Sequence, residues 1–382
     1  MNNFIYLDYA ASTPLDLQVV EKMSACLSSP TLFANAASRS HKLGQQAAQA
    51  IEQAREAIAA TINAQTSDSL VFTSGATEAN NLAIKGIADF HQRRGKHIIT
   101  WATEHHAILD PCEYLSRRGY DITYLNPLPN GLFDLAALKA AIRDDTILIS
   151  CVYVNSETGI TQDVKKIVEI AHARGVYCHV DAAQAVGKIA VDVQSLEVDL
   201  LSLSAHKVYG PKGIGALYIK PQPRVRLTPQ MQGGGHEHGL RSGTLATHQI
   251  VGMGAAFKLV TEKLANDQAH AKILNHTLLE GLSAIKAIKL NSDPAHAVPN
   301  IVNVSFLGLD TNILLPHLSN LALSTGSACN SGSLEPSYVL TAMGLAREVA
   351  ASAVRFSFGR FTTIDEINTA IKEITDYVSC NS

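Results

Sequence analysis

The sequence predicts an α/β fold in which helices cover both faces of a mainly parallel sheet, with a smaller α/β domain beside it. Short apolar runs alternate with helical patterns along most of the chain. Several of these runs are apolar throughout, as expected for strands that are buried on both faces. With 382 residues, of which 46% are hydrophobic, the chain has the length for two domains and the side chains for a large core.

Seven strands are predicted for the large sheet, each a short run rich in apolar residues. They are Ser69–Phe72, His97–Thr100, Asp121–Leu125, Thr146–Tyr153, Val176–Val180, Leu200–Leu203 and Gly215–Ile219. Helical patterns precede or separate the first of them, at Asp16–Leu27, Ser40–Ile62, Ala76–Arg93 and Ile108–Arg118. Ligands of such sheets bind beyond the carboxyl ends of the strands, so polar residues just after a strand are the first candidates for a site.

The domain boundary is expected along a long helix in the second half of the chain. A glycine-rich stretch, Gly233–Gly239, interrupts the alternation, and a helical pattern then covers Thr247–Asp267. Mixed α/β patterns follow. A boundary near residue 260 gives a large domain at 16–260 and a small domain at 1–15 and 261–382.

Charge and hydropathy exclude several classes of function. The net charge of −3 and the pI of about 6.6 do not suggest a nucleic-acid surface. The longest apolar runs, such as Ile147–Val154, are too short to span a bilayer. The N-terminus has no basic region followed by an apolar core, so a cytoplasmic protein is expected. Neither Cys-x-x-Cys nor His-Glu-x-x-His occurs, and no metal site is expected.

The cysteines fall into two groups. Buried, unreactive thiols are expected in the helical and strand-like patterns that hold Cys26, Cys112, Cys151 and Cys178. Cys380 lies near the C-terminus and is expected to be incidental. Cys329 differs, because it lies among small and polar residues in Ser324–Ser333. That setting favours an exposed and reactive thiol.

Lys207 is the leading candidate for a catalytic group. It follows the predicted strand Leu200–Leu203 and stands in Ser204-Ala-His-Lys, before a glycine-rich turn. An amine beside two hydrogen-bonding side chains suits a Schiff base with an aldehyde cofactor. The alternative is an ordinary surface lysine.

Two further segments add the parts that a pyridoxal-phosphate (PLP) site needs. Thr73–Asn80 follows a strand and opens a helix, where backbone N–H groups with the hydroxyls of Ser74 and Thr77 make an anion site. An ordinary capped turn explains the same residues. Asp181 directly follows a strand and could pair with a protonated pyridine nitrogen. A helix N-cap is the competing interpretation.

Other polar residues near strand ends have both a functional and a structural interpretation. Gln184, Asn155 and Ser156 could bond the phenolic oxygen of the cofactor. His105 could stack on its ring and exchange protons near neutral pH, although most histidines are structural. Arg355 is a lone charge in a strand pattern, where it binds either a substrate carboxylate or a structural anion partner.

Taken together, these segments resemble the cysteine desulfurases of the NifS/IscS type, within the class V aminotransferase family of PLP enzymes. The resemblance covers nearly the whole chain and implies the fold of the type I PLP-dependent transferases. It rests on an ordered set of motifs: Tyr6-Leu-Asp-Tyr-Ala-Ala-Ser-Thr, Phe72-Thr-Ser-Gly-Ala-Thr-Glu, Thr103-Glu-His, Asp181-Ala-Ala-Gln, Ser204-Ala-His-Lys, Arg241-Ser-Gly-Thr, Ser327-Ala-Cys and Arg355-Phe-Ser.

The resemblance implies a role for each cofactor contact. Lys207 would carry PLP, Asp181 would bind the pyridine nitrogen and Gln184 the phenolic oxygen, with Asn155 and Ser156 beside it. His105 would stack on the ring. The phosphate would be held by Ala76, Thr77, Ser204 and His206, together with Thr244 from the other subunit of a homodimer.

The implied reaction is the conversion of L-cysteine to L-alanine. Cys329 would accept the sulfur as a persulfide, and Arg355 and Asn35 would bind the substrate. The sulfur would pass to an acceptor protein of iron–sulfur cluster assembly, tRNA thiolation or DNA phosphorothioation. The alternatives are a selenocysteine lyase or another aminotransferase-like PLP enzyme, and outside catalysis a docking platform whose chemistry has decayed.

The sequence departs from the family pattern in three places. Ser156 stands where the family usually has Asn, and Ala34-Asn-Ala replaces the usual Gly-Asn-Pro around Asn35. The chain also ends soon after its last helical pattern and looks shorter than IscS-type members. The shorter end weakens the case for housekeeping cluster assembly and leaves room for a specialised sulfur donor.

Overall fold

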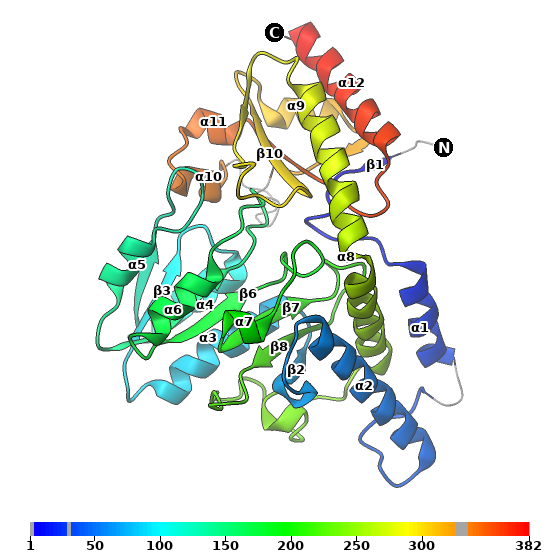
Figure 1. The fold of residues 1–382 in the computed structure, drawn as a ribbon, viewed down its shortest axis with the longest axis vertical. Helices are drawn as coiled ribbons and strands as arrows, with labels where there is room; N and C mark the ends of the chain where they lie inside the picture. Colours follow the sequence, from blue (N-terminus) through cyan, green and yellow to red (C-terminus); the bar gives the residue numbers. More distant parts are fainter. Residues whose placement is uncertain (1–3, 29–31, 326–334, 382) are drawn as a thin grey trace.

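The fold contains a large mixed sheet and a smaller α/β unit stacked at one end of it (Figure 1). The computed structural model describes residues 4–28, 32–325 and 335–381. The strands of the large sheet are β2 (Leu70–Thr73), β3 (His97–Trp101), β4 (Asp121–Leu125), β5 (Thr146–Val152), β6 (Tyr177–Asp181), β7 (Leu200–Ser204) and β8 (Gly215–Ile219). Their order is β2-β8-β7-β6-β5-β3-β4, and β8 alone runs antiparallel to its neighbours. The predicted mainly parallel, seven-stranded sheet is confirmed.

Both faces of this sheet are buried, which explains why its strands are apolar throughout. All of β3 is buried: Ile99 and Trp101 belong to one apolar core, and Ile98 belongs to the core on the opposite face. The helices that precede or connect these strands are α1 (Leu17–Ser28), α2 (Lys42–Thr61), α3 (Ala76–His91), α4 (His106–Ser116), α5 (Leu135–Ala141), α6 (Val164–His172) and α7 (Val193–Leu196).

Three strands run one residue further than the apolar pattern indicates. Thr73, Asp181 and Ser204 are polar, but their backbones still pair with Gly215 or Ser202 on the neighbouring strands. The apolar pattern stops one residue early because pairing in a sheet depends on the backbone and not on the side chain. As a result, three polar side chains are fixed on the rigid carboxyl ends of β2, β6 and β7.

Helix α8 (Thr247–Leu282) is longer than predicted. The expected end at Asp267 is wrong, because Leu274, Leu278 and Leu282 continue the buried stripe for several turns. The first half of the helix packs into the core of the large sheet, and the second half packs into a separate core with Leu7 and Phe356. A single 36-residue helix therefore joins the two cores.

The smaller unit contains two short sheets. Strands β12 (Ala353–Ser357), β10 (Ile301–Phe306) and β9 (Ile288–Leu290) form an antiparallel sheet, and β1 (Ile5–Tyr6) pairs in parallel with β11 (Leu321–Ala322). The first and the last elements of the structure, β1 and α12, therefore lie in the same unit. The remaining helices are α9 (Thr311–His317), α10 (Tyr338–Ala342), α11 (Arg347–Ala351) and α12 (Ile364–Asn381).

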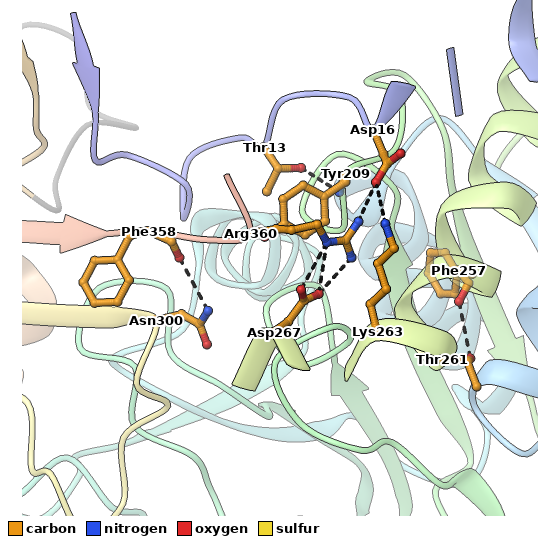
Figure 2. Close-up of polar contacts among 10 residues, drawn as sticks. All are labelled: Thr13, Asp16, Tyr209, Phe257, Thr261, Lys263, Asp267, Asn300, Phe358 and Arg360. Atoms are coloured by element: carbon orange, nitrogen blue, oxygen red, sulfur yellow. Dashed lines mark hydrogen bonds and ion pairs between the residues drawn. The ribbon is translucent and has the colours of Figure 1, made fainter. Parts of the chain in front are cut away.

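Arg360 ties the junction between the two parts together (Figure 2). Its guanidinium donates to Asp16 at 2.7 Å and to Asp267 of α8 at 2.8 Å. It also lies 4.2 Å above the ring of Tyr209, whose hydroxyl accepts from the backbone N–H of Arg360 at 2.8 Å. The backbone N–H of Tyr209 in turn donates to the Thr13 hydroxyl at 2.7 Å. The N-terminal segment, the loop after β7 and the segment after β12 are therefore held in one arrangement.

Candidate active site

A cavity of about 510 Å³ opens beyond the carboxyl ends of β2, β6 and β7. Its walls come from the large sheet, from the N-terminal residues Ala10 and Ala11, and from β12 of the smaller unit. The predicted site residues that line it are Ala76, Thr77, His105, Asn155, Ser156, Asp181, Gln184, Ser204, His206, Lys207 and Arg355. A larger hollow of about 670 Å³ elsewhere is lined by none of them.

Two predicted residues do not line this cavity, and the structure does not describe a third. Asn35 and Thr244 are both exposed, and neither lines it. Asn35 instead lines a second cavity together with Gly234, Gly235 and Leu245, the residue that follows Thr244. Cys329 lies outside the described residues, as does most of the segment around it.

The amine of Lys207 is held by the N-terminal segment. Its Nζ donates to the carbonyl oxygens of Ala10 at 2.5 Å and of Ala11 at 2.7 Å. Burial, and then the charges of Lys207, Lys212 and Lys188, lower the pKa of His206 to about 4. His206 is therefore neutral near pH 7, and the surroundings favour an anion.

The start of α3 supplies the features of a phosphate site. Its first turn has no capping side chain, and Gly75 before it has a φ of +151°, which disfavours any residue with a Cβ. Across the turn, the hydroxyl of Ser204 is buried and has no hydrogen-bond partner in the described part of the chain. Because buried hydroxyls are normally paired, this one marks the place of a ligand oxygen.

Asp181 is fixed as a hydrogen-bond acceptor at the end of β6. Its carboxylate accepts from the side chain of Asn80 at 2.7 Å and from the backbone N–H of Ala183 at 2.9 Å. Among the described residues no helix begins directly after Asp181, so the predicted helix N-cap is wrong, and the bond of Asp181 to Ala183 fixes a turn instead. Sequence reasoning gave Asn80 no role, although it lies one turn after Ala76 on the same helix, which places both on one face.

A buried lysine orients Gln184. Lys188 Nζ donates to Gln184 Oε1 at 2.9 Å, and Gln184 Nε2 donates to the carbonyl of Ala10 at 2.7 Å. Burial, and to a smaller extent the charge of Lys207, lowers the pKa of Lys188 to about 7. No pattern in the sequence pointed to Lys188, since a lone lysine after a glycine is ordinary at a surface.

His105 and Asn155 shape the loops that carry them. His105 Nδ1 accepts from the backbone N–H of Ala107 at 3.0 Å, so the neutral ring carries its proton on Nε2. The carboxamide of Asn155 accepts from the backbone N–H groups of Glu157 and Thr158 and donates to the carbonyl of Thr103. Contact of Asn155 or Ser156 with the cofactor stays a prediction.

Arg355 lies on β12 and combines both of its predicted roles. It donates from Nη2 to Asp8 at 2.7 Å and from Nη1 to the carbonyl of Ser156 at 3.0 Å. Its Nε is buried and has no partner among the described residues, and the side chain reaches the cavity. A donor thus remains available for a ligand anion.

The four cysteines predicted to be buried are buried. Burial raises the pKa of the Cys112 thiol to about 12 and raises the pKa of Cys26 as well. The thiols of Cys112 and Cys26 therefore stay protonated and do not qualify as nucleophiles. Across residues 4–28, 32–325 and 335–381, His, Cys, Asp and Glu side chains form no group of three or more that could hold a metal ion. No helix in the same ranges has both the length and the apolar character to cross a membrane.

The fold and the site together define a PLP-dependent enzyme of the aminotransferase type, and comparison with known sequences agrees. The profile of the aminotransferase class-V family matches residues 5–369. The chain belongs to this family. It is 55% identical, over 98% of its length and 92% of the relative's, to the cysteine desulfurase IscS of Aeromonas salmonicida (strain A449).

Solved structures extend the similarity to the fold. A NifS-like protein superposes with a TM-score of 0.92 at 33% identity, covering 98% of this chain and 99% of that one. The structure of SspA in complex with cysteine gives a TM-score of 0.82 at 39% identity, covering 94% of this chain and 100% of that one.

The family is PLP-dependent, and the residues of this cavity fit that cofactor. The unpaired Ser204 hydroxyl and the uncapped start of α3 suit a phosphate, Asp181 suits a pyridine nitrogen, and Lys207 suits an aldehyde.

Proposed function

We propose that this protein is a cysteine desulfurase that converts L-cysteine to L-alanine and places the sulfur on Cys329. The observation that carries the proposal is one cavity that brings Lys207, Asp181 and Arg355 together. The identity of 55% with an IscS cysteine desulfurase over nearly the whole chain supports this choice among PLP reactions.

The residues of the cavity divide the work between binding and proton transfer. PLP bound to Lys207 supplies an electron sink for the substrate Cα. Asp181, fixed by Asn80 and by the backbone of Ala183, keeps the pyridine nitrogen protonated. Arg355 binds the substrate carboxylate, and the amine of Lys207, once free, moves the proton at Cα.

Sulfur transfer needs a thiolate and a group that handles the substrate proton. His105 carries its own proton on Nε2 and lines the cavity, so it can exchange protons with the substrate thiol. Cys329 as thiolate attacks the substrate sulfur; an S–S bond forms and the substrate C–S bond breaks. The carbon fragment takes up two protons, one at Cβ where the sulfur leaves and one at Cα, and leaves as alanine. These replace the protons taken from Cα and from the substrate thiol, so the overall step consumes no external oxidant or reductant.

A homodimer is the proposed assembly. Large apolar side chains are exposed on α1 and shortly after it: Leu17 at 82%, Leu27 at 63% and Phe33 at 64%. Exposed apolar side chains that lie together are typical of a protein–protein interface. The glycine-rich loop before Thr244 is anchored to α2, because the Arg55 guanidinium donates twice to the Glu237 carboxylate at 2.8 Å. In a homodimer, exposed Thr244 and Asn35 would reach the partner's cavity.

The sulfur acceptor is proposed to be a second protein, belonging to a scaffold, thiolation or phosphorothioation system. Such a partner must approach Cys329, whose segment joins β11 to α10 in the smaller unit. The location proposed for this exchange is the cytoplasm.

Product analysis tests the proposal directly. The purified protein, incubated with L-cysteine and a thiol reductant, should release alanine and sulfide in equal amounts without any keto acid. Borohydride treatment followed by peptide mapping should find the cofactor on Lys207. Keto-acid-dependent amino transfer would favour an aminotransferase, and release from selenocysteine alone would favour a selenocysteine lyase.

A further inference from the structure

Glu157 is a buried carboxyl group in the wall of the active-site cavity. It lies two residues after Asn155, is 2% exposed and lines the cavity beside Ser156 and Arg355. Its Oε1 is buried without a hydrogen-bond partner in the part of the chain that the structure describes. Buried carboxylate oxygens without partners are rare in folded proteins and call for an explanation.

The cavity holds an unpaired donor to match this unpaired oxygen. Arg355 Nε is also buried without a partner among the described residues, and the charge of Arg355 acts on the Glu157 carboxyl. A carboxylate ligand placed at these two groups could accept from Arg355 Nε and from a protonated Glu157. No other group of the mechanism offers such a neutral carboxylic acid beside the substrate site.

The charges around Arg355 favour a neutral Glu157 once a substrate anion is bound. Asp8 already pairs with Arg355 at 2.7 Å and neutralises it. The nearby phenol of Tyr6 stays neutral, because burial and Asp8 raise its pKa. Burial raises the pKa of Glu157, whereas the hydroxyl of Ser337, which precedes α10, and the charge of Arg355 lower it. A substrate carboxylate beside both Asp8 and an ionised Glu157 would face two like charges.

We propose that Glu157 is a substrate-binding residue whose protonated carboxyl completes the carboxylate site of Arg355, so that substrate affinity falls when Glu157 ionises. This inference rests on the proposed function, because it takes Arg355 as the group that binds the substrate carboxylate. Burial raises the pKa of Glu157 to about 7, so the change falls within the working range of pH.

The sign of the pH dependence follows from linkage. Below pH 7 Glu157 is protonated and donates to the substrate. Above pH 7 the substrate binds only if Glu157 takes up a proton, so affinity drops by about tenfold per pH unit. Other groups, including the substrate amine, also titrate in this range. The test therefore compares two proteins that differ only at residue 157, so that the other titrations affect both Kd values equally.

The test is a substrate titration of the holoenzyme in a Cys329→Ser background, followed by the cofactor absorbance from pH 6 to pH 9. The ratio of the Kd for L-cysteine with Glu157 intact to the Kd with Glu157→Gln should stay flat below about pH 7. It should then rise by about tenfold per pH unit, because Gln does not ionise. Cysteamine has the same amine and thiol but no carboxylate, so its ratio should stay flat at every pH.

A matched control is Glu104→Gln. Glu104 is equally buried with an unpaired Oε2, but it does not line the cavity. The ratio of the Kd for L-cysteine with Glu104 intact to the Kd with Glu104→Gln should show no rise with pH. A ratio for Glu157→Gln that is independent of pH, or one that rises equally with cysteamine, overturns the inference.

A second readout uses the unaltered residue. Infrared difference spectra of the Cys329→Ser protein should show a protonated carboxyl band that is lost near pH 7 and moves to higher pH with L-cysteine bound. A band that does not move overturns the inference even if Glu157→Gln fails to fold. Failure of the proposed function looks different, since L-cysteine would then leave the cofactor spectrum unchanged or bind equally well to Arg355→Gln.

Discussion

Two buried arginines near β12 differ in how completely they are bonded. The side chains of Arg355 and Arg360 are only 5% and 10% exposed. All three nitrogens of the Arg360 guanidinium bond to Asp16 or Asp267, whereas Arg355 keeps a buried Nε without a partner among the described residues. Saturated bonding fixes a junction, and an open donor leaves room for a ligand.

The cavity and the domain junction differ in the same direction, although the junction also has one unpaired buried atom, Asn300 Oδ1, in the described ranges. In the cavity wall, Ser204 Oγ and Glu157 Oε1 also lack partners in the described ranges, as does Oδ1 of Asn80, whose side chain bonds Asp181. Single unpaired atoms occur elsewhere, for example Trp101 Nε1 and Asn291 Oδ1. It is the gathering of donors and acceptors around one hollow that distinguishes the site.

The largest expected effect is the loss of activity in Lys207→Ala. This variant removes both the cofactor anchor and the group that moves the Cα proton, so alanine release should fall to background. The fold should survive with little change in melting temperature, because the Lys207 amine donates to two backbone carbonyls of the N-terminal segment and is not part of an apolar core. Lys212→Ala, in the same cavity wall, should keep most of its activity; the opposite result would show that Lys212 is the anchor.

At the domain junction, Arg360→Met should lower the free energy of unfolding, because it removes one partner of a buried ion pair. Removal of one partner from a buried ion pair typically costs about 3–5 kcal/mol of unfolding free energy. Denaturant unfolding measures the loss, and the double variant with Asp267→Asn should lose less than the sum of the single variants. A strictly additive pair would mean that the Arg360 network does not act as a unit.

Arg355→Gln should weaken substrate binding, whereas Arg360→Met should weaken the fold. Loss of a charge-assisted contact with the substrate costs about 1.5–3 kcal/mol, which corresponds to a rise in KM for L-cysteine of roughly tenfold to 150-fold. Steady-state kinetics measure it, and cysteamine serves as the carboxylate-free control. An equal effect on both substrates would assign Arg355 to the structure alone.

The smallest expected effect belongs to Ser204→Ala. A neutral hydrogen bond contributes about 0.5–1.5 kcal/mol, so the Kd for PLP should rise by roughly twofold to tenfold. The stability of the cofactor-free protein should stay the same or increase, because the variant removes a buried hydroxyl that has no partner. A clear loss of stability without cofactor would contradict the phosphate role.

The strand pattern predicted the sheet, and the motifs at strand ends predicted most of the cavity. Lys207, Asp181 and Ser204 could be found because chain order alone places them at the same edge of a parallel sheet. Asn80, Lys188 and Glu157 could not, since their roles depend on contacts with residues distant in sequence or on burial that no local pattern encodes. The end of α8 was missed because the helix changes the core against which it packs.

The central claim is that sulfur leaves the substrate for Cys329. Mass spectrometry of peptides after a single turnover with L-cysteine, without reductant, tests it most directly. The account predicts one added sulfur atom on the peptide that carries Cys329, in equal amount to alanine, and none on exposed Cys380. Alanine formed in full while the Cys329 peptide stays unmodified would contradict it.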